Sequence, residues 1–290
     1  MNQDNKLSRD VRSQTCQHTE PPLFSIITVT LNCREALEKT LESIDQQSFR
    51  DFEHIIKDGG STDGTLDFLH TPRVDARTVV VTAKDKGIYD AMNHALETAT
   101  GEYFLFLNAG DLLATPESLH DVAAACRSNG LPDLVYTDYQ TDTNQIMRNP
   151  SAPGRFFFFR TMICHQVCYV RRHCFDRLGK FDIRLKILAD YDFLLRLVLS
   201  GTMSFHHIPV ITCIFDTGGA SSLPSNRNLH AFEIHAVRRR HFRKWERIIY
   251  GGIIMMTLPS LRNRIVRDYR GTAIAKIYQY FVNRMYAKTS

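Results

Sequence analysis

The sequence lacks both a run long enough to span a membrane and an apolar leader segment. Its longest nearly apolar stretch, Ile248 to Pro259, has twelve residues, whereas a helix that spans a bilayer needs about 20. Met1 to Glu20 is polar with mixed charges, so we expect no signal peptide. The seven cysteines are scattered and odd in number, which gives no disulfide framework and favours a reducing, cytosolic compartment.

Glycine-rich phosphate-binding motifs are also missing. No G-x-G-x-x-G follows the first predicted strand and no G-x-x-x-x-G-K-[ST] occurs. The sequence therefore gives little support to a dinucleotide-binding or P-loop protein.

Zinc-binding patterns are sparse as well. Thiol and imidazole side chains crowd between Cys164 and Cys174, but no paired C-x-x-C motifs accompany them, so a zinc site is a minor alternative.

What is present is an ordinary globular composition with an uneven charge. The chain has 290 residues, 43% of them hydrophobic and 23% charged, which excludes a disordered or collagen-like protein and allows one or two domains. Residues 227–290 carry 14 Lys/Arg and 3 Asp/Glu, whereas residues 1–226 carry 22 and 28. An acidic body with a basic C-terminal region indicates binding to nucleic acid or to an anionic membrane surface, or simply solubility.

Apolar strands alternate with amphipathic helices in the first part of the chain. Phe24 to Leu31 is β-branched and nearly continuous, which is typical of a strand buried on both faces. This alternation predicts an α/β fold with a mostly parallel central sheet flanked by helices. Further strands are expected over Phe52–Ile56, Thr78–Thr82 and Tyr103–Leu107, and helices over Arg34–Gln47, Thr65–Leu69 and Asp90–Thr98.

Polar residues stand where these strands end. They are Asn32, Asp58, Asp85 and the segment from Asn108 to Asp111. Ligands of parallel sheets bind outside the carboxyl ends of the strands, so these residues are candidates for one binding site. Asp111 could hold a divalent cation that bridges to a phosphate, or it could be a turn or cap residue. Asp58, in the segment DGGSTDGT, is open to the same two interpretations.

A second pair of carboxylates, Asp190 and Asp192, stands before an apolar helix expected over Phe193 to Leu199. An aspartate beside an acceptor hydroxyl can act as a general base and remove its proton as a bond forms. The alternative is that one of the two caps the helix. The four phenylalanines from Phe156 to Phe159 are typical of a core or a pocket lining.

Taken together, these blocks resemble the inverting family 2 glycosyltransferases, which have the GT-A fold. The resemblance covers about Phe24 to Ser222 and rests on the ordered blocks FSIITVTLN, DGGSTDGT, DKGIYDAMNHAL, GEYFLFLNAGD, HQ, ADYDF and GGASS. The third and fourth blocks look like the subgroup that builds bacterial exopolysaccharide, colanic-acid-type capsule and lipopolysaccharide. The implied organisation is a flexible tail over 1–22, a catalytic domain over 23–226 with a nucleotide-sugar half (23–115) and an acceptor half (116–226), and a basic amphipathic helical region over 227–290.

The resemblance implies a role for each candidate residue. Asn108 and Gly110 occupy positions that are often acidic in the family, which leaves Asp111 as the carboxylate for Mg²⁺ or Mn²⁺. Asp190 matches the aspartate of the family's Glu-Asp base motif, with Ala189 in place of the glutamate, and Asp192 is the second candidate base. Nucleotide-sugar contacts are implied for Thr30, Asn32, Asp58, Asp85 and Asn108, and a place near the diphosphate or the acceptor for His165, Gly218 and Gly219.

The activity that the resemblance implies is transfer of a sugar from a nucleoside-diphosphate sugar, with UDP favoured by family frequency. The implied acceptor is a hydroxyl of a glycan or of an undecaprenyl-diphosphate-linked oligosaccharide. A sugar nucleotidyltransferase would share the fold and the metal, but it typically has a glycine-rich basic loop where this chain has Leu31-Asn-Cys-Arg-Glu. The depleted acidic motif also leaves room for a transferase that has lost its chemistry.

A non-catalytic nucleic-acid-binding protein would instead use the basic C-terminal region. The acidic body and the lack of a nucleic-acid module argue against it, so no nucleic-acid partner is expected. Basic residues from Arg238 to Arg247 precede the apolar stretch, and an apolar helical stripe follows from Ile274 to Tyr286. This combination favours a helix lying on an anionic membrane, although the stripe could equally pack on the body. We therefore expect a cytoplasmic protein, peripheral on the inner face of the membrane.

Overall fold

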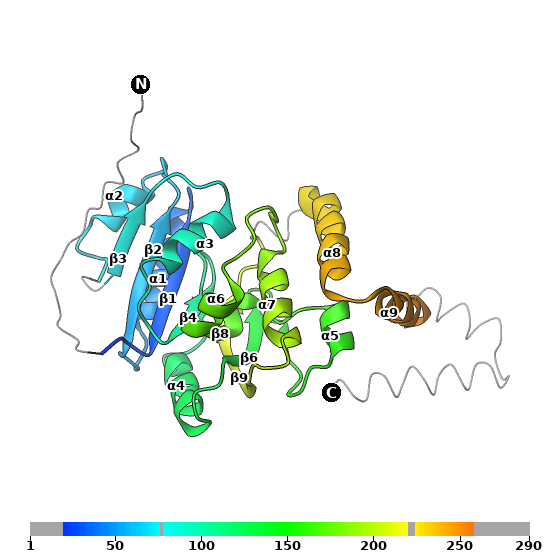
Figure 1. Cartoon of the computed structure of the whole chain (residues 1–290). Helices are drawn as coiled ribbons and strands as arrows, with labels where there is room; N and C mark the ends of the chain where they lie inside the picture. The colour runs from blue at the N-terminus through cyan, green and yellow to red at the C-terminus, as the bar shows by residue number, and fades with distance from the viewer. Residues whose placement is uncertain (1–19, 76–77, 220–223, 258–290) are drawn as a thin grey trace.

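One twisted sheet forms the centre of the molecule (Figure 1). The computed structural model describes residues 20–75, 78–219 and 224–257. The nine strands of the described residues form a sheet in the order β3-β2-β1-β4-β8-β6-β9-β5, with β7 paired to β6. Most of the predicted N-terminal tail, part of the GGASS block and the stripe from Ile274 to Tyr286 lie outside the described residues.

Four parallel strands build the N-terminal half of the sheet. They are β1 (Phe24–Thr30), β2 (Phe52–Asp58), β3 (Thr78–Thr82) and β4 (Tyr103–Phe106). β1 is buried along its whole length, as its β-branched sequence predicts. The helices between the strands are α1 (Arg34–Asp45), α2 (Thr65–Leu69) and α3 (Ile88–Leu96). The predictions for this half are confirmed, with shifts of at most two residues at the element ends.

Helices cover both faces of this half because successive strand residues point to opposite sides. On one face, Ile56 of β2 packs with Leu37 of α1 and Phe68 of α2. Its neighbour Ile55 belongs instead to the main core, which also contains Met92 of α3. The sheet is therefore closed off on both faces, and its open edge for a ligand is the one at which the strands end.

The other half of the sheet mixes strand directions. β8 (Cys168–Arg171) runs antiparallel to both of its neighbours, β4 and β6 (Leu134–Thr141), while β9 (Phe205–Phe215) runs parallel to β6. The expectation of parallel strands thus describes the first half best. The remaining elements are β5 (Leu112–Leu113), β7 (Ile146–Met147), α4 (Ser118–Ser128), α5 (Arg155–Arg160), the 3₁₀ turn η1 (His165–Val167), α6 (Arg172–Leu178) and α7 (Ala189–Leu199).

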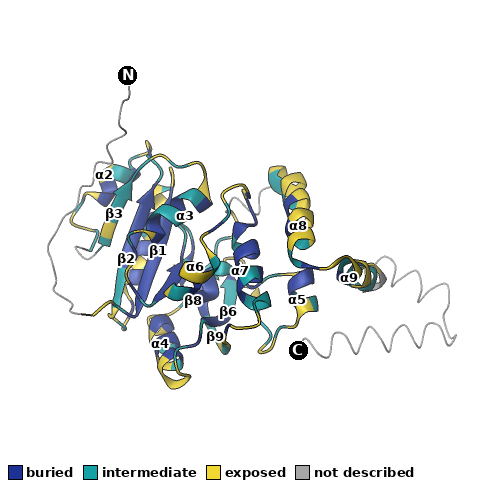
Figure 2. Cartoon of the chain, in the orientation of Figure 1, coloured by how far each residue is buried: buried dark blue, intermediate teal, exposed yellow. Residues whose placement is uncertain are grey.

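An aromatic cluster joins β4 to α6 and α7. Phe175 of α6 stacks on Phe193 of α7 with ring centroids 4.2 Å apart. Phe181 meets Phe106 edge-on at 5.1 Å and Phe193 at 5.4 Å. Stacked and edge-on pairs stabilise a core beyond the area they bury. The cluster fixes the start of α7 against the sheet, in the buried interior shown in Figure 2.

Two helices follow β9 and the short 3₁₀ turn η3 (Pro224–Asn226). α8 (Arg227–His241) and α9 (Lys244–Thr257) lie at the end of the molecule farthest from β3 (Figure 1). α8 packs on α7 and buries Glu233 and Val237. The described part of the basic region expected from residue 227 onward is therefore attached to the second half of the fold through α7 and α8. Among the described helices, none combines the length and apolarity that crossing a membrane requires.

The four-phenylalanine run forms α5 and holds α9 in place. Phe158 and Phe159 are buried, in agreement with a core role. The ring of Phe159 contacts Phe242 at 5.2 Å and Tyr250 at 5.3 Å between centroids. Arg155, at the start of α5, donates two hydrogen bonds to Glu246 of α9 at 2.7 and 3.0 Å.

Candidate active site

The loops after β1 and β2 meet at the carboxyl edge of the sheet, where Thr30 pairs in register with Asp58. Asp58 is fully buried. Its Oδ1 accepts hydrogen bonds from the amides of Gly60 (2.8 Å) and Ser61 (2.9 Å), and its Oδ2 accepts one from the Ser61 hydroxyl (2.5 Å). The carboxylate therefore holds the DGGSTDGT loop from inside, as an aspartate in a turn does.

Asn32 ties this loop to the end of β1. Its backbone has a φ of 51°, a left-handed conformation that asparagine tolerates better than most residues. Its backbone N–H donates to the Ser61 hydroxyl (2.8 Å), and its side-chain Oδ1 accepts from the backbone N–H of Thr62 (2.7 Å). Below it, Oγ1 of Thr30 lies 3.0 Å from Sγ of Cys33. The two loops form one connected surface at the strand ends.

Asp85 is held by a buried cation. Nζ of Lys57, a residue with no exposed side-chain surface, donates to Oδ2 of Asp85 at 2.7 Å and to the carbonyls of Asp58 (2.9 Å) and Ala83 (2.7 Å). On its other side, Oδ1 of Asp85 lies 3.1 Å from Nδ1 of His94 on α3. Lys57 thus fastens the segment after β3 to the end of β2.

Four side chains meet at the part of the edge between β4 and α7. Nδ1 of His165 lies 2.9 Å from Oδ2 of Asp190, and Nε2 of the same ring lies 3.2 Å from Nδ2 of Asn108. The Tyr89 hydroxyl reaches Oδ1 of Asp190 at 2.9 Å and the Ile187 carbonyl at 2.5 Å. The structure therefore brings Asn108, His165 and Asp190 together.

Asp111 lies beside this group, in a buried polar pocket of its own. Its Oδ2 accepts from Nε2 of Gln166 (2.9 Å) and its Oδ1 from the amide of Asp216 (3.0 Å). The side chain is 4% exposed, and this burial raises the pKa of Asp111 from 3.8 to about 6, against the hydrogen bonds that lower it. Neighbouring residues of the HQ block thus bind the two carboxylates, His165 binding Asp190 and Gln166 binding Asp111.

The raised pKa makes Asp111 a cost to folding at neutral pH. The unfolded chain loses this proton near 3.8 and the folded chain near 6, so stability falls as pH rises between these values and stays lower above them. We expect the free energy of unfolding of the wild type, relative to that of Asp111→Asn, to fall by about 1.4 kcal/mol between pH 5 and pH 8. Urea titrations at pH 5 and pH 8 measure this difference. An equal effect at both pH values would contradict it.

Asp192 is not brought to this group. It is 1% exposed and points toward α8, where its Oδ1 accepts from Arg240 (2.7 Å) and from His241 (2.9 Å). Its Oδ2 accepts from Arg196 (3.1 Å). Burial opposes ionisation of Asp192, but these hydrogen bonds and charges outweigh it and lower its pKa. Asp192 therefore connects α7 to α8, and the geometry leaves Asp190 as the candidate base.

Neither of these aspartates caps a helix end. α7 begins at Ala189, earlier than the Phe193 that its apolar pattern predicts, so both lie in the first turn. Their negative charges there complement the positive end of the helix dipole. Glu233 of α8 instead holds the segment just before α7, because its carboxylate accepts from the amides of Lys186 (2.6 Å), Ile187 (3.0 Å) and Leu188 (3.0 Å).

The turn after β9 borders Asp111. Asp216 bonds Asp111 through its amide and accepts from the Gly218 amide at 2.8 Å, so the turn with Gly218 and Gly219 lies near the predicted metal residue. Gly110 has a φ of 106°, and a Cβ there would come within 2.7 Å of Oδ2 of Asp216. The Asp216 carboxylate fills the space that a side chain at position 110 would need.

These residues fit a hard divalent cation. Each oxygen of Asp111 accepts one hydrogen bond from the described chain and so keeps a second lone pair. The adjacent Asp216 supplies another carboxylate, and carboxylate oxygens are the ligands that Mg²⁺ and Mn²⁺ prefer. Asp111 and Asp216 are therefore the residues that could hold such an ion.

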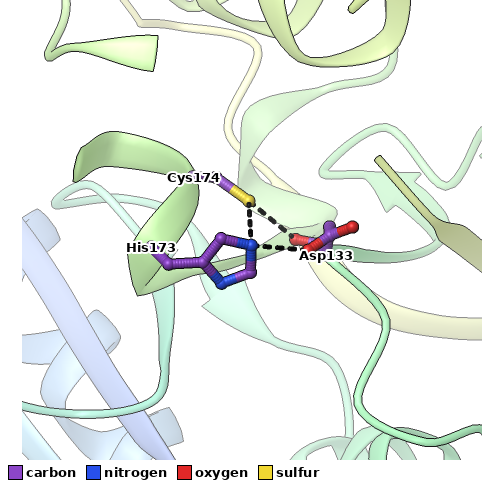
Figure 3. A group of neighbouring side chains, drawn as sticks. All are labelled: Asp133, His173 and Cys174. Carbon is purple, nitrogen blue, oxygen red and sulfur yellow. Dashed lines mark hydrogen bonds and ion pairs between the residues drawn. The ribbon is translucent and has the colours of Figure 1, made fainter. Parts of the chain in front are cut away.

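A different cluster lies at the opposite edge, between the start of β6 and α6 (Figure 3). Nε2 of His173 lies 2.7 Å from Oδ1 of Asp133 and 3.8 Å from Sγ of Cys174. Burial raises the pKa of Cys174 to about 12, so without a bound ion its sulfur is a thiol. The crowded cysteines and histidines of the sequence are thus divided between two places, with His165 at one and His173 at the other.

Several residues of the site went unrecognised in the sequence. Tyr89 and Gln166 stood within the blocks DKGIYDAMNHAL and HQ, so their motifs offered a signal. Lys57 directly precedes Asp58, but a lysine in a strand is ordinarily a solvent-facing residue. Asp216 and Glu233 offered no local signal, because their partners lie far away in the sequence.

This fold and site define a class of protein: the mixed α/β sheet flanked by helices, with its carboxylates at the strand ends, is the GT-A glycosyltransferase fold. The family model described as glycosyl transferase family 2 matches residues 25–183. A PGL/p-HBAD biosynthesis glycosyltransferase of Mycobacterium tuberculosis (strain ATCC 25177 / H37Ra) is 33% identical over 256 residues, or 84% of this chain and 98% of the relative. The chain belongs to glycosyl transferase family 2 and is a glycosyltransferase.

Solved structures share the fold at low identity. S. aureus TarS (residues 1–349) in complex with UDP-GlcNAc has a TM-score of 0.59 at 19% identity, and the match covers 84% of this chain and 72% of that one. The mannosyltransferase PcManGT from Pyrobaculum calidifontis, in complex with GDP-Man and Mn²⁺, has a TM-score of 0.54 at 18% identity, covering 92% and 81%. These two structures support the fold assignment. The nucleotide-sugars and the Mn²⁺ bound in them are ligands of those proteins.

Proposed function

We propose that the protein is an inverting transferase that moves a sugar from a UDP-sugar to a hydroxyl of a glycan or of an undecaprenyl-diphosphate-linked oligosaccharide, in the biosynthesis of a bacterial surface polysaccharide. The observation that carries the proposal is the position of Asp190. It stands in the first turn of α7 at the acceptor side of the strand ends, and the HQ block links it to the Asp111 pocket. The neighbour that holds UDP-GlcNAc supports UDP as the nucleotide.

In this proposal Asp190 is the general base. It removes the proton of the acceptor hydroxyl, whose oxygen attacks the anomeric carbon from the face opposite the diphosphate. The bond from that carbon to the diphosphate oxygen breaks, and its electron pair leaves with the nucleoside diphosphate. A single displacement inverts the configuration, so the chain needs no second carboxylate as a nucleophile.

The remaining predicted residues bind or shape the donor site in this proposal. Asp111 and Asp216 would hold Mg²⁺ or Mn²⁺, which when bound neutralises the charge of the departing diphosphate. Thr30, Asn32 and Asp85 lie along the strand ends where the base and ribose would sit. Asp58 acts by holding its loop, since its carboxylate is buried under that loop.

A donor panel tests this proposal directly. Thermal unfolding is followed with UDP-, GDP- and dTDP-sugars, each with and without Mn²⁺. A ligand at 100 times its Kd adds about 2.7 kcal/mol to the stability, which is a shift of a few degrees for a domain of this size. We expect a Mn²⁺-dependent shift with a UDP-sugar, and loss of the Mn²⁺-dependent part in Asp111→Asn. A shift with GDP- or dTDP-sugars alone would contradict the choice of UDP.

The exposed face of α9 supports the proposed contact with an anionic membrane on its cytoplasmic side. Large apolar side chains lie along one stripe: Trp245 (53% exposed), Ile248 (66%), Ile249 (50%) and Met255 (62%). Exposed Arg243 and Lys244 stand at the start of the helix. Apolar side chains beside basic ones suit a helix in a membrane interface, where each basic residue adds about 1 kcal/mol.

A vesicle assay tests the membrane contact. We expect the full chain to co-sediment with vesicles that contain phosphatidylglycerol, and the double variant Ile248→Glu/Ile249→Glu to partition at least tenfold less, because two apolar anchors become charged. Ile146→Glu, which alters an exposed apolar residue on β7, is the matched control. Equal partitioning of the double variant and the control would rule out α9 as the contact.

A further inference from the structure

The two oxygens of Asp190 are used unequally. Oδ1 accepts from the Tyr191 amide at 2.8 Å and from the Tyr89 hydroxyl at 2.9 Å. Oδ2 accepts from His165 alone among the described residues. A carboxylate oxygen has two lone pairs, so the lone pair that remains for an acceptor hydroxyl is on Oδ2, next to the histidine.

The partners of His165 select one form of its ring. An ionised Asp190 has no proton to donate, so Nδ1 of His165 must donate to it. The other ring nitrogen, Nε2, faces Nδ2 of Asn108 at 3.2 Å. The NH₂ group of an amide is a donor, so in this orientation of Asn108 Nε2 accepts, while Oδ1 of Asn108 is buried with no partner among the described residues. The two contacts together favour the neutral ring with its proton on Nδ1.

We propose that His165 is a positioning residue for the Asp190 base and that Asn108 holds the His165 ring in the Nδ1–H tautomer. This inference rests on the proposed function. The His165 N–H occupies one lone pair of Oδ2 and thereby aims the other at the acceptor hydroxyl. His165 is 20% exposed and Asp190 10%, so few water molecules compete for this bond. Asn108 then serves the base, although its position in the LNAGD block suggested the nucleotide.

This assignment explains an amide at position 108. A carboxylate there would be an acceptor facing Nε2 and would favour a second proton on the ring. The resulting cation would bind Oδ2 more tightly and make it a poorer proton acceptor. The asparagine keeps the ring neutral, so that its contact with Asp190 orients the base with less loss of basicity.

The tautomer is measured without any substrate. The full chain is labelled with ¹⁵N-histidine, its ring nitrogens are recorded by NMR at pH 8, and His165 is assigned from the signals that vanish in His165→Asn. We expect a neutral ring with the proton on Nδ1. A proton on Nε2, alone or together with one on Nδ1, would overturn the role given to Asn108.

Kinetics test the positioning role. We expect His165→Leu to lower kcat about 100-fold, at the upper end of the effect of residues that orient a reactive group, with donor affinity changed less than twofold. His165→Asn places an amide nitrogen near the position of Nδ1 and should regain at least tenfold of that loss. His173→Leu removes the histidine of another His–Asp pair, at the opposite edge of the sheet, and should keep the wild-type kcat.

The possible results separate this inference from the proposed function. If Asp190→Asn is inactive and His165→Leu keeps the wild-type kcat, His165 is not a positioning residue. The inference also fails if His165→Leu and His165→Asn lower kcat equally while both unfold in urea as the wild type does. A donor at the position of Nδ1, which the asparagine restores, would then not be needed to orient Asp190. Wild-type transfer by Asp190→Asn would instead refute the proposed base, while the measured tautomer would still stand.

Discussion

Asp190→Asn is expected to lower kcat for sugar transfer by about a thousandfold, because a general base contributes between a hundredfold and ten-thousandfold. The substitution keeps the size of the side chain, and the carbonyl oxygen can still accept from Tyr89 and from the Tyr191 amide. The capacity to take up a proton is lost, and so is the hydrogen bond from Nδ1 of His165, which would face the new amide nitrogen. Donor affinity should change less than twofold, since the proposed base acts on the acceptor hydroxyl.

The measurement pairs steady-state kinetics with calorimetric titration of the donor. Asp121→Asn, on the exposed surface of α4, is the matched control, because it removes the same charge away from the site. Transfer at the wild-type rate in Asp190→Asn would remove this residue from the role of base. A large loss of donor affinity with unchanged kcat would place it on the donor instead.

Lys57→Met is expected to lower the free energy of unfolding by about 3 kcal/mol, because breaking a buried ion pair leaves an uncompensated charge. The substitution removes the donor from Asp85 and from the carbonyls of Asp58 and Ala83, all within 2.9 Å of Nζ. Asp85 keeps His94, which limits the loss. The thioether has a similar length, so the cost comes from lost hydrogen bonds and charge more than from a cavity.

Urea titration followed by fluorescence measures this loss, with Lys39→Met as the control on the exposed face of α1. Adding Asp85→Asn to Lys57→Met should recover part of the stability, since the unpaired carboxylate is then gone. A double variant no more stable than Lys57→Met alone would show that the charge of Asp85 is not the source of the cost.

The first half of the fold was predictable because its signals are local. β1 reads as a buried strand from its own residues, and the helix over Thr65–Leu69 and the strand over Thr78–Thr82 were predicted with their observed bounds. The start of α7 was placed four residues late. The segment just before it is held by a carboxylate from α8, more than forty residues away, and no pattern near Asp190 reports it.

The candidate site was predictable as a place more than as a set of contacts. Strand ends meet at one edge in any parallel sheet, so the convergence of Asn32, Asp58 and Asp85 follows from the alternation alone. That both oxygens of Asp58 bind its own loop does not follow from residue type, because the same residues make turns and ligand loops. The link from His165 to Asp190 spans 25 residues and depends on the packing of η1 against α7.

The Glu233 contacts have a consequence for how such enzymes can be recombined. The family model ends at residue 183, before the proposed base Asp190, while the carboxylate that holds the segment before α7 is contributed from α8. The start of α7, which carries the proposed base, thus depends on a contact from α8. A chimera that exchanges the N-terminal half of the fold can be joined before the segment that Glu233 holds. A chimera that exchanges the chain from residue 227 onward must supply its own carboxylate for the amides of Ile187 and Leu188.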